Sequence, residues 1–214
     1  MKENEYTHGS FIPNGRIIKN EEIKFFPELG EVFENLKNDY GKVLFPLCTI
    51  DLQIINPTWL GKAHFILTFI DYSGETNSLE YFTDYCDDYS ISFDKINDKY
   101  TLQADIRILE VSEGYEEFRN ELELAYKRSK EGYSQGIVYE MLSDRIETNE
   151  LIMQVGGKPM WTQNDETPKD PNGKELEFIG QVFGGYFFPN ELEQDIFLFY
   201  SPEFNFFVQR FQYS

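Results

Sequence analysis

Hydrophobic and polar residues alternate along several stretches of this chain, which is the pattern of half-buried β-strands. Residues 47–55 alternate most clearly, and residues 63–72 repeat the pattern after a short gap that contains Asn56 and Pro57. A gap of this kind predicts an antiparallel hairpin. Residues 100–111 alternate too, and further strands are predicted at Arg16–Ile18, 176–183, 195–200 and 205–213.

Two other segments repeat their apolar residues at helical spacing. Residues 27–40 are expected to form one helix, which Gly41 ends. Residues 113–131 form the clearest predicted helix, with Ser112 as its N-cap, acidic residues in its first turn and basic residues in its last. Gly132 is expected just beyond its C-terminus.

Predicted strands outnumber predicted helices, and strands that are neighbours in sequence are expected to pair antiparallel. The expected fold is therefore α+β, predominantly antiparallel β-sheet with two or more helices packed on it. We expect a single domain over residues 1–214, with residues 1–24 as a polar N-terminal arm. Residues 137–142 and 150–155 are apolar segments whose pattern does not decide between helix and strand.

The charge of the chain narrows the class of partner. There are 38 Asp and Glu residues against 19 Lys and Arg, which gives a net charge of −19. Such a surface repels the phosphates of nucleic acids and the headgroups of anionic membranes, so neither is an expected partner. A basic protein or a cation is favoured, although solubility alone also explains the charge.

The two cysteines and the first residues of the chain indicate the cellular compartment. Cys48 and Cys86 match no Cys-x-x-Cys pattern, so neither a zinc site nor a redox site is predicted. Residues 1–16 lack the apolar stretch of a signal peptide, and no apolar run approaches the length of a membrane span. We therefore expect a cytoplasmic protein, and the excess of Lys over Arg is typical of an AT-rich bacterial genome.

An acidic belt over residues 71–94 is the first candidate site. It contains no Lys or Arg, and tyrosines stand between its carboxylates. The simplest interpretation is a solvated loop whose aromatic rings tuck into the core. A second is a recognition face for a basic protein, and a third is a calcium site, although the spacing does not match an EF-hand loop. The candidate binding residues are Tyr81, Asp84, Tyr85, Asp87 and Asp88.

Residue types that carry catalysis are sparse. The chain has two histidines, His8 in the polar arm and His64, which is expected at the start of a strand as an edge residue. Neither a Gly-x-Ser-x-Gly elbow nor a phosphate-binding Gly-x-x-x-x-Gly-Lys-Ser/Thr motif is present. Carboxylates are too numerous to single out an acid–base pair. We predict no catalytic residue, no metal ligand and no cofactor.

A tract over residues 155–182, rich in Gly, Pro and Gln, is the second candidate site. Two glycines can adopt positive φ, and a proline then fixes the direction of the chain. One interpretation is a pinned loop in which glutamine side chains bond the backbone, above a buried indole. The other is a pocket for a polar ligand or peptide. The structural candidates are Gly156, Gly157 and Pro159, and the binding candidates are Trp161, Gln163 and Gln181.

The tract also carries a family resemblance. The strings GGKPMWTQ (156–163) and FIGQ (178–181), followed by DIFLFYSPE (195–203), resemble the signature of the YwqG-like family of unknown function. The resemblance covers roughly residues 150–214. It implies an antiparallel α+β fold, with two related halves as one arrangement, and relatives among bacterial interaction and immunity-type proteins. It assigns no catalytic role.

Three function classes remain open. The first is a non-catalytic binding protein, such as an immunity-type protein that caps a basic toxin. The second is an enzyme or small-ligand-binding protein that uses Trp161, Gln163 and Gln181. The third is a structural domain without a site of its own.

Overall fold

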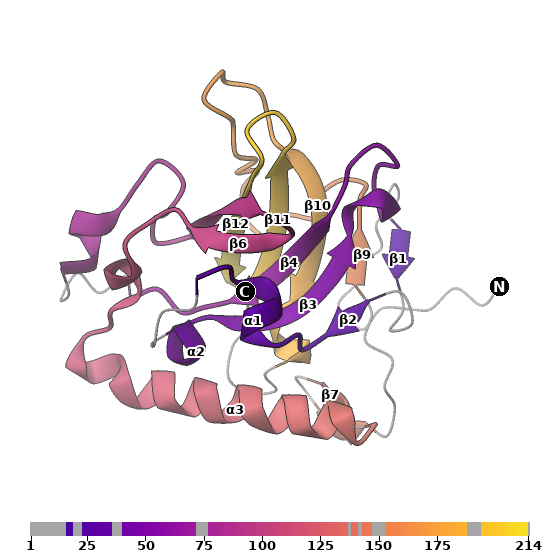
Figure 1. Cartoon of the computed structure of the whole chain (residues 1–214). Helices are drawn as coiled ribbons and strands as arrows, with labels where there is room; N and C mark the ends of the chain where they lie inside the picture. The colour runs from indigo at the N-terminus through magenta and orange to yellow at the C-terminus, as the bar shows by residue number, and fades with distance from the viewer. Residues whose placement is uncertain are drawn as a thin grey trace.

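The computed structural model describes residues 16–18, 23–35, 40–71, 77–136, 138–140, 143–146, 153–187 and 194–213. Its strands form a seven-stranded, a three-stranded and a two-stranded sheet, and every pairing between these strands is antiparallel (Figure 1). The prediction of an α+β fold made mostly of antiparallel sheet is confirmed.

The strands and helices have the following bounds. In spatial order, the seven-stranded sheet contains β1 (Arg16–Ile18), β9 (Met153–Val155), β10 (Glu177–Phe183), β11 (Gln194–Ser201), β12 (Phe206–Tyr213), β5 (Ser90–Ile96) and β6 (Lys99–Leu102). The three-stranded sheet contains β2 (Lys24–Phe25), β3 (Phe45–Asp51) and β4 (Lys62–Leu67), and the two-stranded sheet β7 (Val138–Glu140) and β8 (Ser143–Ile146). The helices are α1 (Leu29–Val32), α2 (Tyr40–Val43) and α3 (Glu116–Ser134).

The C-terminal strands and the first hairpin follow the sequence pattern. β10, β11 and β12 lie within two residues of their predicted bounds, and β3 and β4 pair as the expected antiparallel hairpin. β1 matches its prediction, and the undecided segments contribute β7 and β9. Of the segment expected as an N-terminal arm, Ile23 is buried and Lys24 pairs with β3, so these two residues belong to the folded domain. The remainder of the arm, residues 1–15 and 19–22, lies outside the described residues.

The prediction of one helix over residues 27–40 is wrong. α1 has only four residues, and Phe33 after it is extended, with φ −111° and ψ 135°. Phe33 is buried and forms a bridge with Tyr100 of β6. Phe33, which fitted the apolar stripe of a helix, is therefore part of the sheet packing. Gly41, which was expected to end the helix, lies inside α2.

Other boundaries shift for local reasons. The strands predicted at 47–55, 63–72 and 100–111 end early. A 3₁₀ turn (Leu52–Ile54) follows the first directly, and the last ends at Leu102, before a 3₁₀ turn at Ile106–Leu109. Ser112 is not the side-chain cap of α3, because a 3₁₀ turn (Glu113–Tyr115) comes first and no capping bond forms. Gly132 is buried inside α3, which ends before Gly136 at φ 75°. β5, inside the acidic belt, was not predicted.

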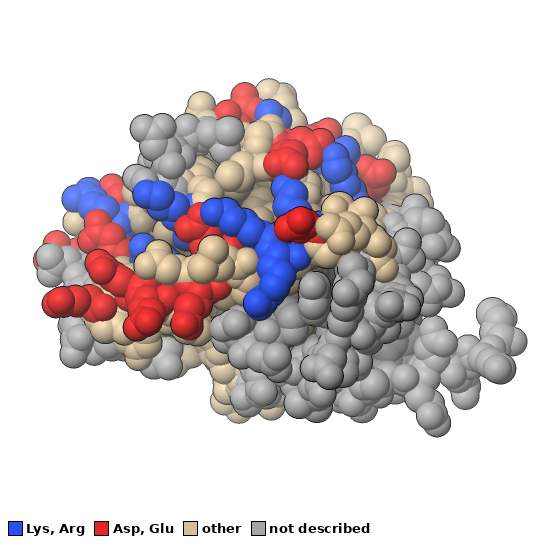
Figure 2. Space-filling model, turned by 90° about the horizontal axis from the view of Figure 1, so that it is seen from below, with Lys and Arg blue, Asp and Glu red and all other residues tan. Residues whose placement is uncertain are grey.

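Helix α3 packs on the three-stranded sheet and its neighbours through aromatic rings. Tyr126 contacts the rings of Phe26 and Phe45, and its hydroxyl donates to the carbonyl oxygen of Pro46 at 2.9 Å. Phe118 packs edge-on against Phe69. The opposite side of α3 faces outward, and Figure 2 shows the molecule from this side.

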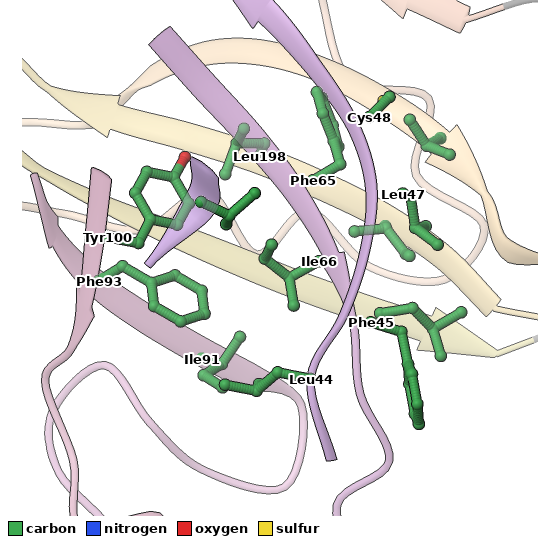
Figure 3. Packing of buried hydrophobic residues seen from close by; sticks show 14 of the residues in the cluster. Leu44, Phe45, Leu47, Cys48, Phe65, Ile66, Ile91, Phe93, Tyr100 and Leu198 are labelled. Atoms are coloured by element: carbon green, nitrogen blue, oxygen red, sulfur yellow. The ribbon is translucent and has the colours of Figure 1, made fainter. Parts of the chain in front are cut away.

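The main hydrophobic core joins both large sheets and α3. Figure 3 shows its centre, where Phe65 and Ile66 of β4 lie among Phe93 of β5, Tyr100 of β6 and Leu198 of β11. These side chains are fully buried. Burial on this scale is the main stabilising contribution to the fold.

Side chains of the seven-stranded sheet form hydrogen bonds to peptide groups on the edge of β4 that has no neighbouring strand. The Gln209 side chain is completely buried; its Oε1 accepts from the Ile66 amide at 2.7 Å, and its Nε2 donates to the Ile66 carbonyl oxygen at 2.6 Å. The Tyr100 hydroxyl accepts from the His64 amide at 2.8 Å. Two residues of the large sheet therefore take the place of a neighbouring strand for the Ile66 amide and carbonyl and for the His64 amide.

His64 lies near the start of β4, an edge strand, as predicted, but it is also buried. The residue is 1% exposed; its Nδ1 lies 2.8 Å from Thr49 Oγ1 and its Nε2 lies 2.8 Å from the Asp98 carbonyl oxygen. Because a carbonyl only accepts, Nε2 carries the proton and Nδ1 accepts from the Thr49 hydroxyl. Burial lowers the pKa of His64 to about 4, although the bond to Asp98 acts in the opposite direction.

This environment predicts a pH-dependent loss of stability. In the unfolded chain a histidine has a pKa of roughly 6.5, so the unfolded state binds a proton before the folded state does as the pH falls from 6.5 toward 4. The free energy of unfolding should fall by about 2 kcal/mol between pH 7 and pH 5 from this residue alone. Urea unfolding at both pH values, compared with His64→Gln, isolates the contribution. Identical pH dependence in the two proteins would contradict it.

Candidate functional site

The two candidate segments meet on the outer face of the seven-stranded sheet, the face that points away from β4. Alternation along the strands gives this face its own small hydrophobic cluster, separate from the main core. Tyr85 from the acidic belt and Trp161 from the tract both pack against it. The buried members of the cluster are Leu176, Phe197, Phe199, Phe206 and Val208.

The paired glycines set the path of the tract as it leaves β9. Gly156 and Gly157 have φ values of 67° and 80°, a region that side chains disfavour. The Gly156 amide donates to the Ile179 carbonyl oxygen of β10 at 2.9 Å. The chain then passes Pro159, which is half-buried, and runs across the outer face. The predicted structural role of the glycines agrees with this geometry.

Three glutamine side chains hold the tract against the sheet. Gln154 Nε2 donates to the carbonyl oxygens of Gly156 and Lys158 at 3.0 and 2.9 Å. Gln181 bonds both the amide and the carbonyl oxygen of Met160, at 3.1 and 3.2 Å.

The third glutamine lies on β12. Gln212 Oε1 accepts from the amides of Thr162 and Gln163 at 2.9 and 3.0 Å, and its Nε2 donates to the Asn164 carbonyl oxygen at 2.8 Å. Together the three side chains bond the backbone from Gly156 to Asn164. Gln181 acts as a backbone clamp, whereas Gln154 and Gln212 had not been singled out.

Trp161 and Gln163 complete the attachment of the tract. The Trp161 ring stacks on Phe197 and Phe199, with centroid separations of 4.5 and 5.8 Å. The Gln163 side chain is exposed, and its Nε2 donates to the Tyr213 carbonyl oxygen at 2.9 Å. The side-chain groups proposed for a ligand therefore already bond the protein's own backbone or sheet.

Residues 83–90 of the acidic belt fold into a compact element, which we call the belt turn. Bridges join Thr83 to Cys86 and Asp87 to Ser90. Asp87 Oδ1 accepts from the Tyr89 amide at 2.8 Å and from the Ser90 hydroxyl at 2.9 Å. The turn is fixed by its own hydrogen bonds. Tyr85 packs against the outer cluster while Asp84 is exposed, as expected for a solvated loop whose aromatic rings tuck into the core.

Further contacts attach the belt turn to the sheet. The Phe211 amide of β12 donates to the Tyr89 carbonyl oxygen at 2.8 Å. The Cys86 thiol lies 3.1 Å from the Ser92 hydroxyl, and the Tyr85 ring lies 4.9 Å from that of Phe206. The turn therefore presents its outward side chains from a fixed position.

Arg210 of β12 connects the belt turn to the tract. Its Nη1 lies 3.3 Å from Asp87 Oδ2 and its Nη2 lies 2.6 Å from Glu166 Oε2. Only 16% of the Arg210 side chain is exposed, so the pair of contacts is partly shielded from water. The Asp87 carboxylate is therefore already engaged, by hydrogen bonds within the belt turn and by the contact with Arg210.

The remaining belt residues differ in their surroundings. Asp84 is exposed and Asp88 is half-buried. Burial raises the pKa of Asp88, and the nearby Asp87 carboxylate adds to the effect. Burial also raises the pKa of Tyr85, with smaller contributions from Asp170 and Asp84.

Tyr81 does not belong to the belt turn. It ends a 3₁₀ turn (Asn77–Tyr81), and the Arg107 guanidinium lies over its ring at 4.2 Å from the centroid. Arg107 is itself held by Asp105, with a 2.8 Å contact between Nη2 and Oδ2. The structure thus connects Tyr85 and Asp87 with the tract, through the outer cluster and Arg210, and places Tyr81 in a separate contact.

Within the described ranges, no three His, Cys, Asp or Glu side chains gather closely enough to hold a metal ion. No helix in the described part of the chain is both long and apolar enough to cross a membrane. No protein-family model, curated protein or solved structure matches the chain. The resemblance to the YwqG-like family therefore stays a prediction based on its motif residues.

The clamp geometry predicts where the tract will loosen. Gln212→Leu removes the acceptor of the Thr162 and Gln163 amides, so their hydrogen exchange should accelerate about tenfold or more. Gln163→Leu is the matched control, because it loses only the bond to the Tyr213 carbonyl and should change the Thr162 rate less than about threefold. Equal rates in the two variants, measured by NMR, would show that Gln212 does not hold the tract.

Proposed function

We propose that this chain is a non-catalytic protein-binding module that caps a basic partner, in the manner of an immunity-type protein for a basic toxin in a bacterial cytoplasm. The observation that carries the proposal is the belt turn. It presents Asp84, Tyr85, Asp88 and Tyr89 from a backbone that is fixed by internal hydrogen bonds and attached to β12.

Rigidity favours such a surface, because a contact that is already ordered loses little conformational entropy on binding. Tyr89 is 44% exposed and Tyr85 is half-buried, so both offer ring area to a partner. Tyrosine contributes a large contact at low entropic cost, which is why it is enriched among residues that dominate binding energy.

Charge supports the same class of partner. The net charge of −19 attracts a basic protein over a distance of about a Debye length and speeds its approach. Asp84 and Asp88 then lie beside the tyrosines, where carboxylates select Lys and Arg side chains. Arg210 neutralises part of this face, but it is itself engaged by Asp87 and Glu166.

The YwqG-like resemblance is compatible with this proposal, because the family includes interaction and immunity-type proteins. The alternative, a small-ligand site at Trp161, Gln163 and Gln181, is less well supported. A ligand there would have to displace the bonds of Gln181 to Met160 and the stacking of Trp161 on the sheet.

The test compares two variants of equal net charge. Asp84→Asn with Asp88→Asn alters the belt turn, and Glu34→Gln with Asp51→Asn removes two exposed carboxylates elsewhere. Each tagged full-length protein is used at low salt to retain proteins from an extract of the source cells, and retained proteins are identified by mass spectrometry. A basic protein should be retained by the unaltered chain and by the control.

The belt variant should bind that partner at least about tenfold more weakly, and the association rate of the unaltered chain should fall as salt rises. Equal weakening in both variants would mean that only total charge matters. Retention of no basic protein at low salt would also contradict the proposal.

A further inference from the structure

Residues 169–175 of the tract form a tight turn, which we call the Asn172 turn. A bridge joins its two ends, and the Gly173 amide donates to the Asp170 carbonyl oxygen at 2.8 Å. The sequence Asp-Pro-Asn-Gly suits this geometry, because Asp, Pro and Gly are each favoured at the turn position that they occupy. Gly173 has a φ of 81°, which glycine adopts without strain.

One buried carboxylate closes the turn, and one exposed amide attaches it to its neighbour. Asp170 is 7% exposed, and its Oδ1 accepts from the amides of Asn172 and Lys174 at 2.9 and 3.0 Å. The Asn172 side chain is exposed, and its Nδ2 donates at 3.3 Å to Oε1 of Glu203, which lies in the connection between β11 and β12. The two loops lie side by side beyond the end of the sheet (Figure 1).

An Asn-Gly pair in such a turn is chemically labile. Asparagine is among the residues that heat and time modify, and a following glycine has no Cβ to hinder attack by its own nitrogen. A Cβ built on Gly173 would meet no atom within 4 Å, and both Asn172 and Gly173 are exposed. The site is therefore open to water and has room for a ring to form.

We propose that Asn172 is a site of spontaneous deamidation, and that opening of the Asn172 turn sets the rate. The Gly173 nitrogen bonds to Asn172 Cγ, the bond from Cγ to Nδ2 breaks, and ammonia leaves with the proton of the Gly173 nitrogen. Water then opens the resulting cyclic imide at either carbonyl, which leaves aspartate or isoaspartate at position 172. Water is the only co-reactant.

The closed turn slows the first step. The Gly173 N–H is held by the Asp170 carbonyl oxygen, and the neighbouring Asn172 and Lys174 amides are held by the Asp170 carboxylate. Short exposed turns open locally at a much lower free-energy cost than the whole domain. The rate in the folded chain is therefore the rate of the open segment multiplied by the fraction of time that the turn is open.

The product changes the contact between the two loops. It carries a carboxylate where the neutral amide donated to Glu203, and two carboxylates at this separation repel each other. Isoaspartate also lengthens the main chain of the turn, so one Asp170 oxygen can no longer accept from both amides. No residue of the belt turn takes part. This inference and the proposed function can therefore fail independently of each other.

Peptide mapping of the full chain by mass spectrometry provides the test. The protein is kept at mildly alkaline pH in native buffer and in concentrated urea. Asn172 should be converted under both conditions, and at least about tenfold more slowly in native buffer. Asn14-Gly15, the other such pair in the sequence, lies outside the described residues and is followed on a separate peptide.

Two variants test the role of the turn. Asp170→Ala should accelerate conversion in native buffer about fivefold, because it removes the acceptor of two turn amides. Asp165→Ala is the matched control, since it removes a carboxylate of the same tract that bonds only Thr167, and it should change the rate less than about twofold. Circular dichroism checks that both variants fold.

Three results would overturn the proposal. The first is an Asn172 that stays unconverted in native buffer while it converts in urea. The second is conversion at the same rate in both conditions, and the third is an equal effect of the two substitutions. If Asp170→Ala does not fold, the comparison of native buffer with urea on the unaltered chain still decides.

Discussion

The open edge of β4 is the constraint on which the rest of the structure depends. A buried strand edge with unpaired peptide groups is costly, because each unpaired group forgoes its hydrogen bonds to water. Here Gln209 supplies an amide that bonds both the N–H and the C=O of Ile66, and Tyr100 accepts from the His64 amide. The three-stranded sheet can therefore lie against the seven-stranded sheet without extending it.

The same chemistry recurs on the other side of the large sheet. A glutamine amide has one acceptor oxygen and two N–H donors, so it can pair with a peptide group much as a neighbouring strand would. Gln181 and Gln212 hold the tract in this way, just as Gln209 holds β4, while Gln154 contributes its two N–H donors. Strand β12 provides glutamines on both faces of the seven-stranded sheet, since Gln209 points inward, toward β4, and Gln212 points outward, toward the tract. The belt turn depends on this strand too, through Arg210 and the Phe211 amide.

Local patterns predicted the fold class and most strands, because β10, β11 and β12 are short segments rich in aromatic and β-branched residues. These local patterns gave wrong predictions where a residue contacts an element that is distant in sequence. Phe33 fits a helical stripe but bridges to Tyr100, and β5 was concealed because its polar residues continue the acidic belt.

The candidate site was predicted in part. Gly156, Gly157 and Gln181 lie within one recognisable motif, whereas Gln212 and Arg210 act on residues more than 40 positions away. Alternation marks these two as outward-facing, but no local signature indicates what they bond. The burial of His64 was missed for the same reason, since its partners Thr49 and Asp98 come from separate hairpins.

The most direct measurement is the free energy of urea unfolding of Gln209→Leu, compared with Gln103→Leu. The first substitution keeps apolar bulk but leaves the Ile66 amide and carbonyl unpaired in the core, and it should lower stability by about 2–5 kcal/mol. The control removes only the half-exposed bond between Gln103 and Asp94 and should change stability by less than about 0.5 kcal/mol. If the two variants are equally stable, the capping of β4 by Gln209 is not what holds the two sheets together.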